Sequence, residues 1–70
     1  MKRMPLREAI PFICRELSLS PAQLARRIDM SDVAVRNWVN GTSGSVKKIR
    51  ARHLLGELAR QAGITIEELE

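Results

Sequence analysis

The chain has 70 residues, with 12 lysines and arginines against eight acidic residues and a formal net charge of +4. A chain this short forms at most one domain with a thin core, and its single cysteine excludes an intrachain disulfide and a cysteine-ligated zinc site. No apolar run approaches the ~18 residues of a membrane span, and charges interrupt the N-terminal segment too early for a signal peptide, so we expect one cytoplasmic domain over residues 1–70.

The charge is unevenly distributed along the chain. Residues 1–56 carry eleven basic and four acidic residues, a net +7, whereas residues 57–70 carry one arginine and four glutamates, a net −3. A basic body with an acidic end favours a polyanionic partner on one surface and some other contact at the end of the chain. The alternative is a basic surface that is merely solvated.

The first predicted helix lies within about 6–17. No segment alternates as a half-buried strand would, and apolar residues recur at helical spacing instead. The first apolar stripe consists of Leu6, Ile10, Ile13 and Leu17. Cys14 lies beside it and is expected to be a buried structural thiol. Pro11 removes a backbone donor inside the stripe, which predicts either a kink or a late start for this helix.

Ser20 begins a strong signal for a second helix. Ser20 can cap free amides, Pro21 suits the first helical position, and Gln23 can complete a capping box. The predicted buried face consists of Leu24, Ala25 and Ile28.

Ser31 is the expected cap of a third helix that runs to about Val39. Asn40-Gly41 ends this helix, because glycine is preferred just past a helix end. A polar loop, "NGTSGS", follows.

Two further helices are expected after the loop. Ser45 caps the fourth, whose apolar side consists of Val46, Ile49, Leu54, Leu55, Leu58, Ala59 and Ala62. Gly63 ends it, and Thr65 caps a last short helix with Glu68 three residues on. The predicted fold is therefore all-α, a compact bundle of about five short helices with no sheet.

The third helix has two sides of different chemistry. At 100° per residue, the side assigned to the core carries Val35, Trp38 and Val39, and the outer side carries Val33, Arg36, Asn37 and Asn40. Arginine can bond guanine twice in the major groove, asparagine can do the same with adenine, and valine can touch a thymine methyl. The outer side therefore suits base reading.

The stretch "LSPAQLARRIDMSDVAVRNWVNG" resembles the helix-turn-helix of the phage lambda repressor and Cro family, the xenobiotic-response-element (XRE) type of regulator. Ala25 matches the alanine of the first motif helix, Ile28 the apolar residue before the turn, and Val35 and Trp38 the buried positions of the second. The later stretch "LARQAGITIEEL" is similar to the last two helices of the family. The resemblance covers about residues 6–70, with the motif at about 20–41.

The resemblance implies a docking mode in which the second motif helix enters the major groove. The implied base-reading residues are Asp32, Val33, Arg36 and Asn37. The implied phosphate-binding residues are Ser20, Gln23, Asn40, Thr42 and Ser43. It also implies a homodimer that reads an inverted repeat with half-sites about one helical turn, ~34 Å, apart.

The chain departs from the family pattern in three places. Asp29 replaces the usual glycine of the turn, and we expect it to keep the left-handed conformation at some strain. Asp32 can accept from a cytosine amino group or simply favour the helix N-terminus. The stretch after Gly41 is longer than expected and includes "VKKIRARH". Its cations are either solvated or add phosphate contacts, and we favour the second for Lys47, Lys48, Arg50 and Arg52.

Enzymatic chemistry has no candidate site in this sequence. His53 is the only histidine, and no catalytic triad, phosphate loop or paired carboxylates stand out, so we expect no enzyme, cofactor or metal. A single-stranded RNA binder would need more aromatic residues than Phe12 and Trp38.

Two functions remain. The first is a nucleoid-associated, sequence-specific double-stranded DNA-binding regulator, a repressor of phage, prophage or bacterial origin. The alternative is a protein-interaction module, such as an antitoxin-like adaptor, whose partner binds the acidic C-terminal segment. The same segment is the predicted homodimer contact, because it carries more apolar residues than a surface tail needs: Ile64, Ile66 and Leu69.

Overall fold

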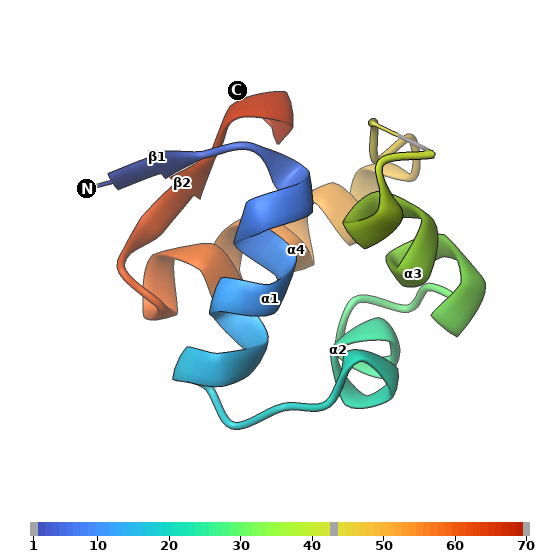
Figure 1. The fold of residues 1–70 in the computed structure, drawn as a ribbon, viewed down its shortest axis with the longest axis horizontal. Coiled ribbons are helices and arrows are strands. Elements are labelled where there is room, and N and C mark those ends of the chain that lie inside the picture. Colours follow the sequence, from blue (N-terminus) through green and yellow to red (C-terminus); the bar gives the residue numbers. More distant parts are fainter. Residues whose placement is uncertain (1, 43, 70) are drawn as a thin grey trace.

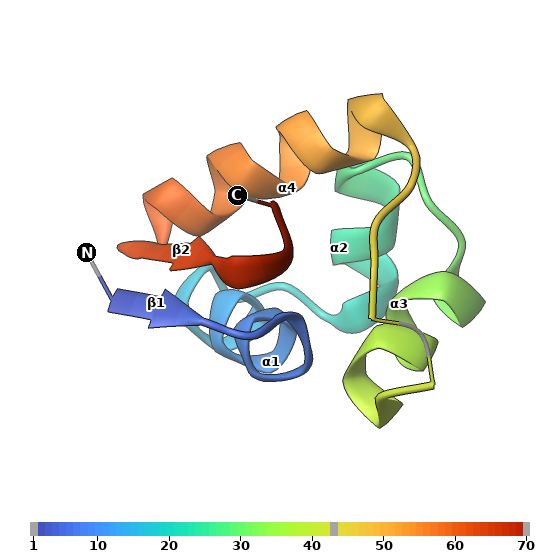
Figure 2. The ribbon, with the colours of Figure 1, turned by 90° about the horizontal axis from the view of Figure 1, so that it is seen from above.

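Four helices and one pair of short strands make up the described part of the chain. The computed structural model describes residues 2–42 and 44–69. Its elements are β1 (Lys2–Met4), α1 (Leu6–Glu16), α2 (Pro21–Arg27), α3 (Asp32–Asn40), α4 (Ile49–Gln61), β2 (Ile64–Ile66) and the 3-10 turn η1 (Glu67–Leu69). The strand pair lies at one end of the molecule and α2 and α3 at the other (Figure 1). Between them α4 runs most of the length of the molecule (Figure 2).

The predicted helical class is confirmed, but the prediction of five helices and no sheet is wrong. β1 pairs with β2 in parallel, with Lys2 opposite Ile64 and Met4 opposite Ile66. Each strand has only three residues, which is too short for an alternating pattern to stand out in a sequence. The two partners also come from opposite ends of the chain, so no local pattern could reveal the pairing.

The predicted fifth helix is replaced by β2 and η1. Thr65 lies in the middle of β2 and caps no helix, and Glu68 has a different role from the one expected. Its Oε1 accepts a hydrogen bond from the backbone N–H of Leu6 at 2.8 Å. Pro5, the N-cap residue of α1, provides no side-chain hydrogen bond. Glu68 therefore satisfies an open amide of α1 and places a carboxylate at the positive end of that helix.

The first and fourth helices also differ from expectation in detail. α1 begins at Leu6, so Pro11 does not delay its start. α4 begins at Ile49 with Lys48 as its N-cap residue and no side-chain cap, so the prediction that Ser45 caps it is wrong. Val46 is buried ahead of the helix in an irregular stretch, with 1% of its surface exposed. Its burial does not depend on helical phase.

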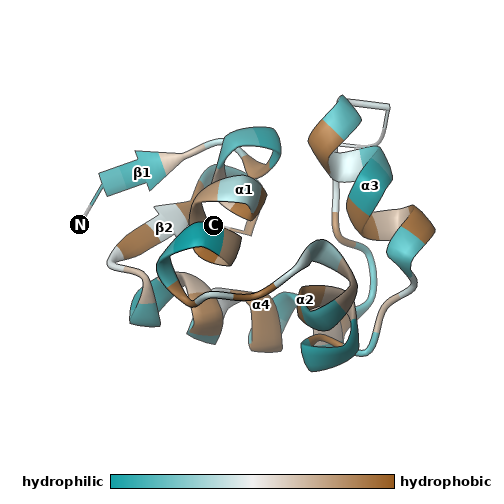
Figure 3. Cartoon of the chain, turned by 60° about the horizontal axis from the view of Figure 1, so that its bottom comes forward, coloured by the Kyte–Doolittle hydropathy of each residue, from teal (hydrophilic) through white to brown (hydrophobic). Residues whose placement is uncertain are grey.

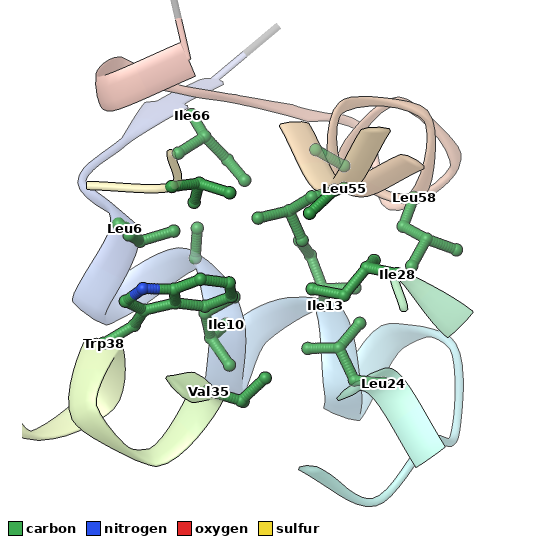
Figure 4. Packing of buried hydrophobic residues seen from close by; sticks show 14 of the residues in the cluster. Leu6, Ile10, Ile13, Leu24, Ile28, Val35, Trp38, Leu55, Leu58 and Ile66 are labelled. Atoms are coloured by element: carbon green, nitrogen blue, oxygen red, sulfur yellow. The ribbon is translucent and has the colours of Figure 1, made fainter. Parts of the chain in front are cut away.

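The core forms where all four helices and β2 meet. The helices carry both hydrophobic and hydrophilic stretches (Figure 3), and the buried side chains converge between them (Figure 4). The largest include Leu6, Ile10, Ile13, Leu24, Ile28, Val35, Leu55 and Ile64. Cys14 is only half-buried against this core, and burial raises the pKa of its thiol, so the thiol stays protonated at neutral pH.

Two residues assigned to the core are exposed. Val39 is 38% exposed and Ile49 is 72% exposed. Val39 lies at the margin of the buried face of α3, beside a shallow depression that it lines with Pro21 and Ala22. Ile49 is the first residue of α4, where the helix extends beyond the core. Helical phase alone places both residues inward, but the limited extent of the core leaves them outside.

Candidate nucleic-acid interface

The start of α2 is built as the sequence predicted. The Ser20 Oγ accepts from the backbone N–H of Gln23 at 3.1 Å, and the Gln23 Oε1 accepts from the backbone N–H of Ser20 at 2.8 Å. This reciprocal pair is a capping box, and Pro21 occupies the first turn. The box uses the oxygens of both side chains, so any phosphate contact would fall to the Ser20 hydroxyl proton and the Gln23 amide nitrogen.

The turn between α2 and α3 is closed by backbone bonds and by an unusual aspartate. The N–H of Met30 donates to the Ala25 carbonyl at 2.9 Å, and Asp29 has a φ of 58°. The left-handed conformation expected for Asp29 is therefore confirmed. Ser31 then caps α3 by accepting from the Ala34 N–H at 3.1 Å. These contacts set the direction in which α3 leaves the turn.

Lys48 reaches back to this turn from the start of α4. Its Nζ lies 2.9 Å from Oδ2 of Asp29 and 3.1 Å from the Asp29 carbonyl oxygen. The hydrogen bond from Lys48 and its positive charge lower the pKa of the Asp29 carboxyl below its usual value, with a smaller contribution from Arg50. The sequence assigned Lys48 to DNA phosphate, but the structure gives its ammonium group a partner within the chain.

The two sides of α3 are separated as expected, except at Val39. Val35 and Trp38 are 0% and 2% exposed, whereas Val33 is 60% exposed. Asp32 and Arg36 are also exposed, and Asn37 is half-buried. α3 thus presents a cation, an amide and an apolar side chain on the surface that the core does not cover.

The end of α3 is also as predicted. Gly41 has a φ of 79°, a conformation that glycine adopts without steric cost. The Thr42 N–H and its Oγ1 hydroxyl both donate to the Asn37 carbonyl, at 3.0 Å and 3.2 Å. Asn40 and Thr42 are both exposed, but the two donors of Thr42 are used by the Asn37 carbonyl, so Asn40 is the better placed of the two to meet phosphate. Ser43, named with them, lies outside the described residues.

Two cations of the basic stretch are bonded within the chain, and two are exposed with no hydrogen bond or salt bridge among the described residues. Lys48 is paired with Asp29, and Arg52 is half-buried and donates to the Val46 carbonyl at 3.1 Å. Lys47 and Arg50 are exposed. Lys47 borders a depression of about 370 Å³ beside α3, whose lining also includes Asn37 and Trp38. Of the four residues predicted to meet phosphate, Lys47 and Arg50 are the better placed.

The residues predicted to form the dimer contact do not form one surface. Ile64 and Ile66 are 1% and 2% exposed and belong to the monomer's own core. Their apolar character, which motivated the prediction, is explained by burial in β2. Leu69 is half-buried and lines a groove against α4. A contact between two copies therefore has to use surfaces other than the side chains of Ile64 and Ile66.

Comparisons with known proteins add no family to this description. No family model matches the chain, and neither a curated protein nor a solved structure matches it. In the described part of the chain, no cluster of three metal-binding side chains occurs and no helix has the length and apolar character to span a membrane. The geometry of α2, α3 and the following basic stretch is therefore the basis for a functional proposal.

Proposed function

We propose that the chain is a sequence-specific double-stranded DNA-binding transcriptional regulator, and more specifically a repressor of the lambda repressor and Cro type. In this proposal α2 and α3 are the helix-turn-helix, and α3 enters the major groove. The observation that carries the proposal is the division of α3 into a core side and an uncovered polar side. Val35 and Trp38 anchor it inward, while Val33 and Arg36 remain exposed.

The size and chemistry of α3 support this reading. An α-helix with its side chains is about 10–12 Å across, so the nine-residue α3 fits a major groove ~12 Å wide. Arg36 would read guanine, Asn37 adenine, and Val33 a thymine methyl. Asp32 is exposed in the first turn of α3, a position compatible both with accepting from cytosine and with favouring the helix N-terminus.

Groups that suit phosphate lie before and after α3 in the chain. The first turn of α2 carries Ser20 and Gln23, whose hydroxyl proton and side-chain amide nitrogen are not used by the capping box. After α3 come Asn40, Lys47 and Arg50, all exposed, whereas the two donors of Thr42 are used by the Asn37 carbonyl. Contacts of this kind fix the position of a protein on DNA, while contacts to base edges supply specificity. The arrangement would add phosphate contacts beside α3 and after its C-terminal end.

Selection from a randomised pool of DNA duplexes tests the proposal without knowledge of the operator. The purified chain should enrich a defined motif over successive rounds. Fluorescence anisotropy should then give tighter binding to the selected duplex than to a scrambled duplex of the same composition. A pool that stays random, with equal affinity for both duplexes, would contradict the proposal and favour the alternative of a protein-binding module.

A further inference from the structure

The outer face of α4 borders a groove that lies away from α2 and α3. Arg52, His53, Gly56, Glu57 and Arg60 of this helix border a groove of about 330 Å³ whose opposite wall includes Thr65 and Leu69. No residue of α2 or α3 lines this groove. The face is therefore free to contact another molecule while α3 contacts DNA.

The fold of a single chain does not explain why position 56 is a glycine. It lies in the interior of α4, where glycine costs about 1 kcal/mol relative to alanine. Its φ is not positive, so the backbone conformation does not require glycine. A Cβ placed at this position would meet nothing within 4 Å, so packing inside the described chain does not require it either. A small residue here leaves room for the close approach of something outside the chain.

The charges beside Gly56 can pair with those of a second copy of the same face, which points to another copy of this chain as the partner. Glu57 and Arg60 are both exposed and three residues apart, and among the described residues neither forms a salt bridge. If a second α4 crosses antiparallel, with the two-fold axis midway between these residues, Glu57 of each copy faces Arg60 of the other. The Glu57–Arg60 ion pair then occurs twice across the interface, as the two-fold symmetry of a dimer requires.

We propose that the α4 face, defined by Gly56, Glu57, Arg60 and the adjoining Leu69, is the contact between two copies of this chain. The need for a second copy rests on the proposed function, because one α3 reads only a few base pairs. Leu69 supplies the apolar centre and the reciprocal Glu57–Arg60 pairs set the register. The dimer contact predicted at the C-terminal segment is thereby moved from Ile64 and Ile66 to α4.

The size of the face predicts a weak dimer. A standard interface buries about 800 Å² per partner, which would be nearly a fifth of the 4354 Å² accessible surface of the chain. One helix face and a short turn provide less than this, as in transient complexes. We therefore expect dissociation in the micromolar range or above and a weakening with added salt, because exposed charges are screened.

Charge reversal followed by sedimentation equilibrium tests the contact without DNA. Glu57→Arg gives a face with two positive charges, and Arg60→Glu gives one with two negative charges. Each variant alone should dimerise at least about tenfold more weakly than the wild type. An equimolar mixture of the two should form a heterodimer, because both facing pairs are then attractive, and the double swap should restore the homodimer. Glu16→Arg, which makes the same charge change as Glu57→Arg at an exposed position of α1, is the control.

Gly56→Gln tests the close approach separately. This variant should be more stable as a monomer, because it removes a glycine from a helix interior, yet it should dimerise more weakly. A wild type that remains monomeric up to about millimolar concentration would overturn the proposal. So would a dimer that is indifferent to these substitutions, or single variants whose mixture and double swap fail to associate.

The same variants separate this proposal from the proposed function. On a selected duplex cut to one half-site, Glu57→Arg should bind as the wild type does, apart from the change in affinity expected of its added net charge, which Glu16→Arg matches. Half-site binding without dimerisation would overturn the α4 contact alone. Dimerisation without any enriched DNA motif would overturn DNA reading alone.

Discussion

At the scale of single residues, the uncovered side of α3 offers the most direct test of base reading. Arg36→Ala should cost about 1–3 kcal/mol of binding free energy on the selected duplex and little on random DNA, because a base contact is lost. Asn37→Ala should behave in the same way. Fluorescence anisotropy on both duplexes measures the difference, and Arg7→Ala at an exposed position of α1 is the control. Equal losses on the two duplexes would mean that these residues touch phosphate only.

Asp29 should make stability depend on pH through its contact with Lys48. The folded-state pKa of this carboxyl is lowered by Lys48. Its contribution to stability is therefore present above the unfolded-state pKa and is lost as pH falls through the folded-state pKa. Asp29→Asn keeps a residue type that tolerates the left-handed conformation but removes the charge.

The expected result is a lower thermal midpoint for Asp29→Asn than for the wild type at neutral pH, measured by circular dichroism. The difference should shrink below pH 3.8, the ordinary pKa of this carboxyl, once Asp29 is protonated in both the folded and unfolded wild-type states. High salt should also reduce it, since the Lys48–Asp29 pair is exposed. A difference that persists unchanged at low pH would assign the effect to backbone conformation.

At the scale of elements, the stretch between α3 and α4 contains two neighbouring lysines with different environments. Lys47 is exposed, whereas the Nζ of Lys48 is bonded to Asp29. Lys47→Ala should reduce the slope of log affinity against log salt by roughly one unit, as expected for one lost phosphate contact. Lys48→Ala should change this slope less. Equal changes would show that Lys48 leaves Asp29 when DNA binds.

At the scale of the whole molecule, Glu68 connects the end of the chain to the start of α1. Its hydrogen bond to the Leu6 N–H spans 62 residues of sequence. Glu68→Ala should destabilise the fold by about 0.5–2 kcal/mol, the usual cost of losing a helix cap, in urea unfolding followed by circular dichroism. Glu67→Ala next to it, exposed in η1, should have little effect. Equal effects would refute a specific capping role.

Much of the structure was readable in the sequence because its signals are local. The Ser20–Gln23 box, the Ser31 cap, the Gly41 end and the Asp29 turn each depend on residues within five positions of one another. The buried and exposed sides of α3 follow mostly from helical phase. The same phase rule failed at Val39 and Ile49, because phase gives a direction but does not say how far the core extends.

Tertiary structure alone decided the features that join distant parts of the chain. β1 pairs with β2 across about 60 residues of sequence, Glu68 caps α1, and Lys48 holds the Asp29 turn from 19 residues away. The sequence suggests another role for the last two side chains: Glu68 as part of a helix cap next to it in the chain, and Lys48 as a phosphate ligand. Only folding brings their actual partners within hydrogen-bonding distance. The sequence by itself determined the helical class and the outward chemistry of α3, because both arise from short-range geometry.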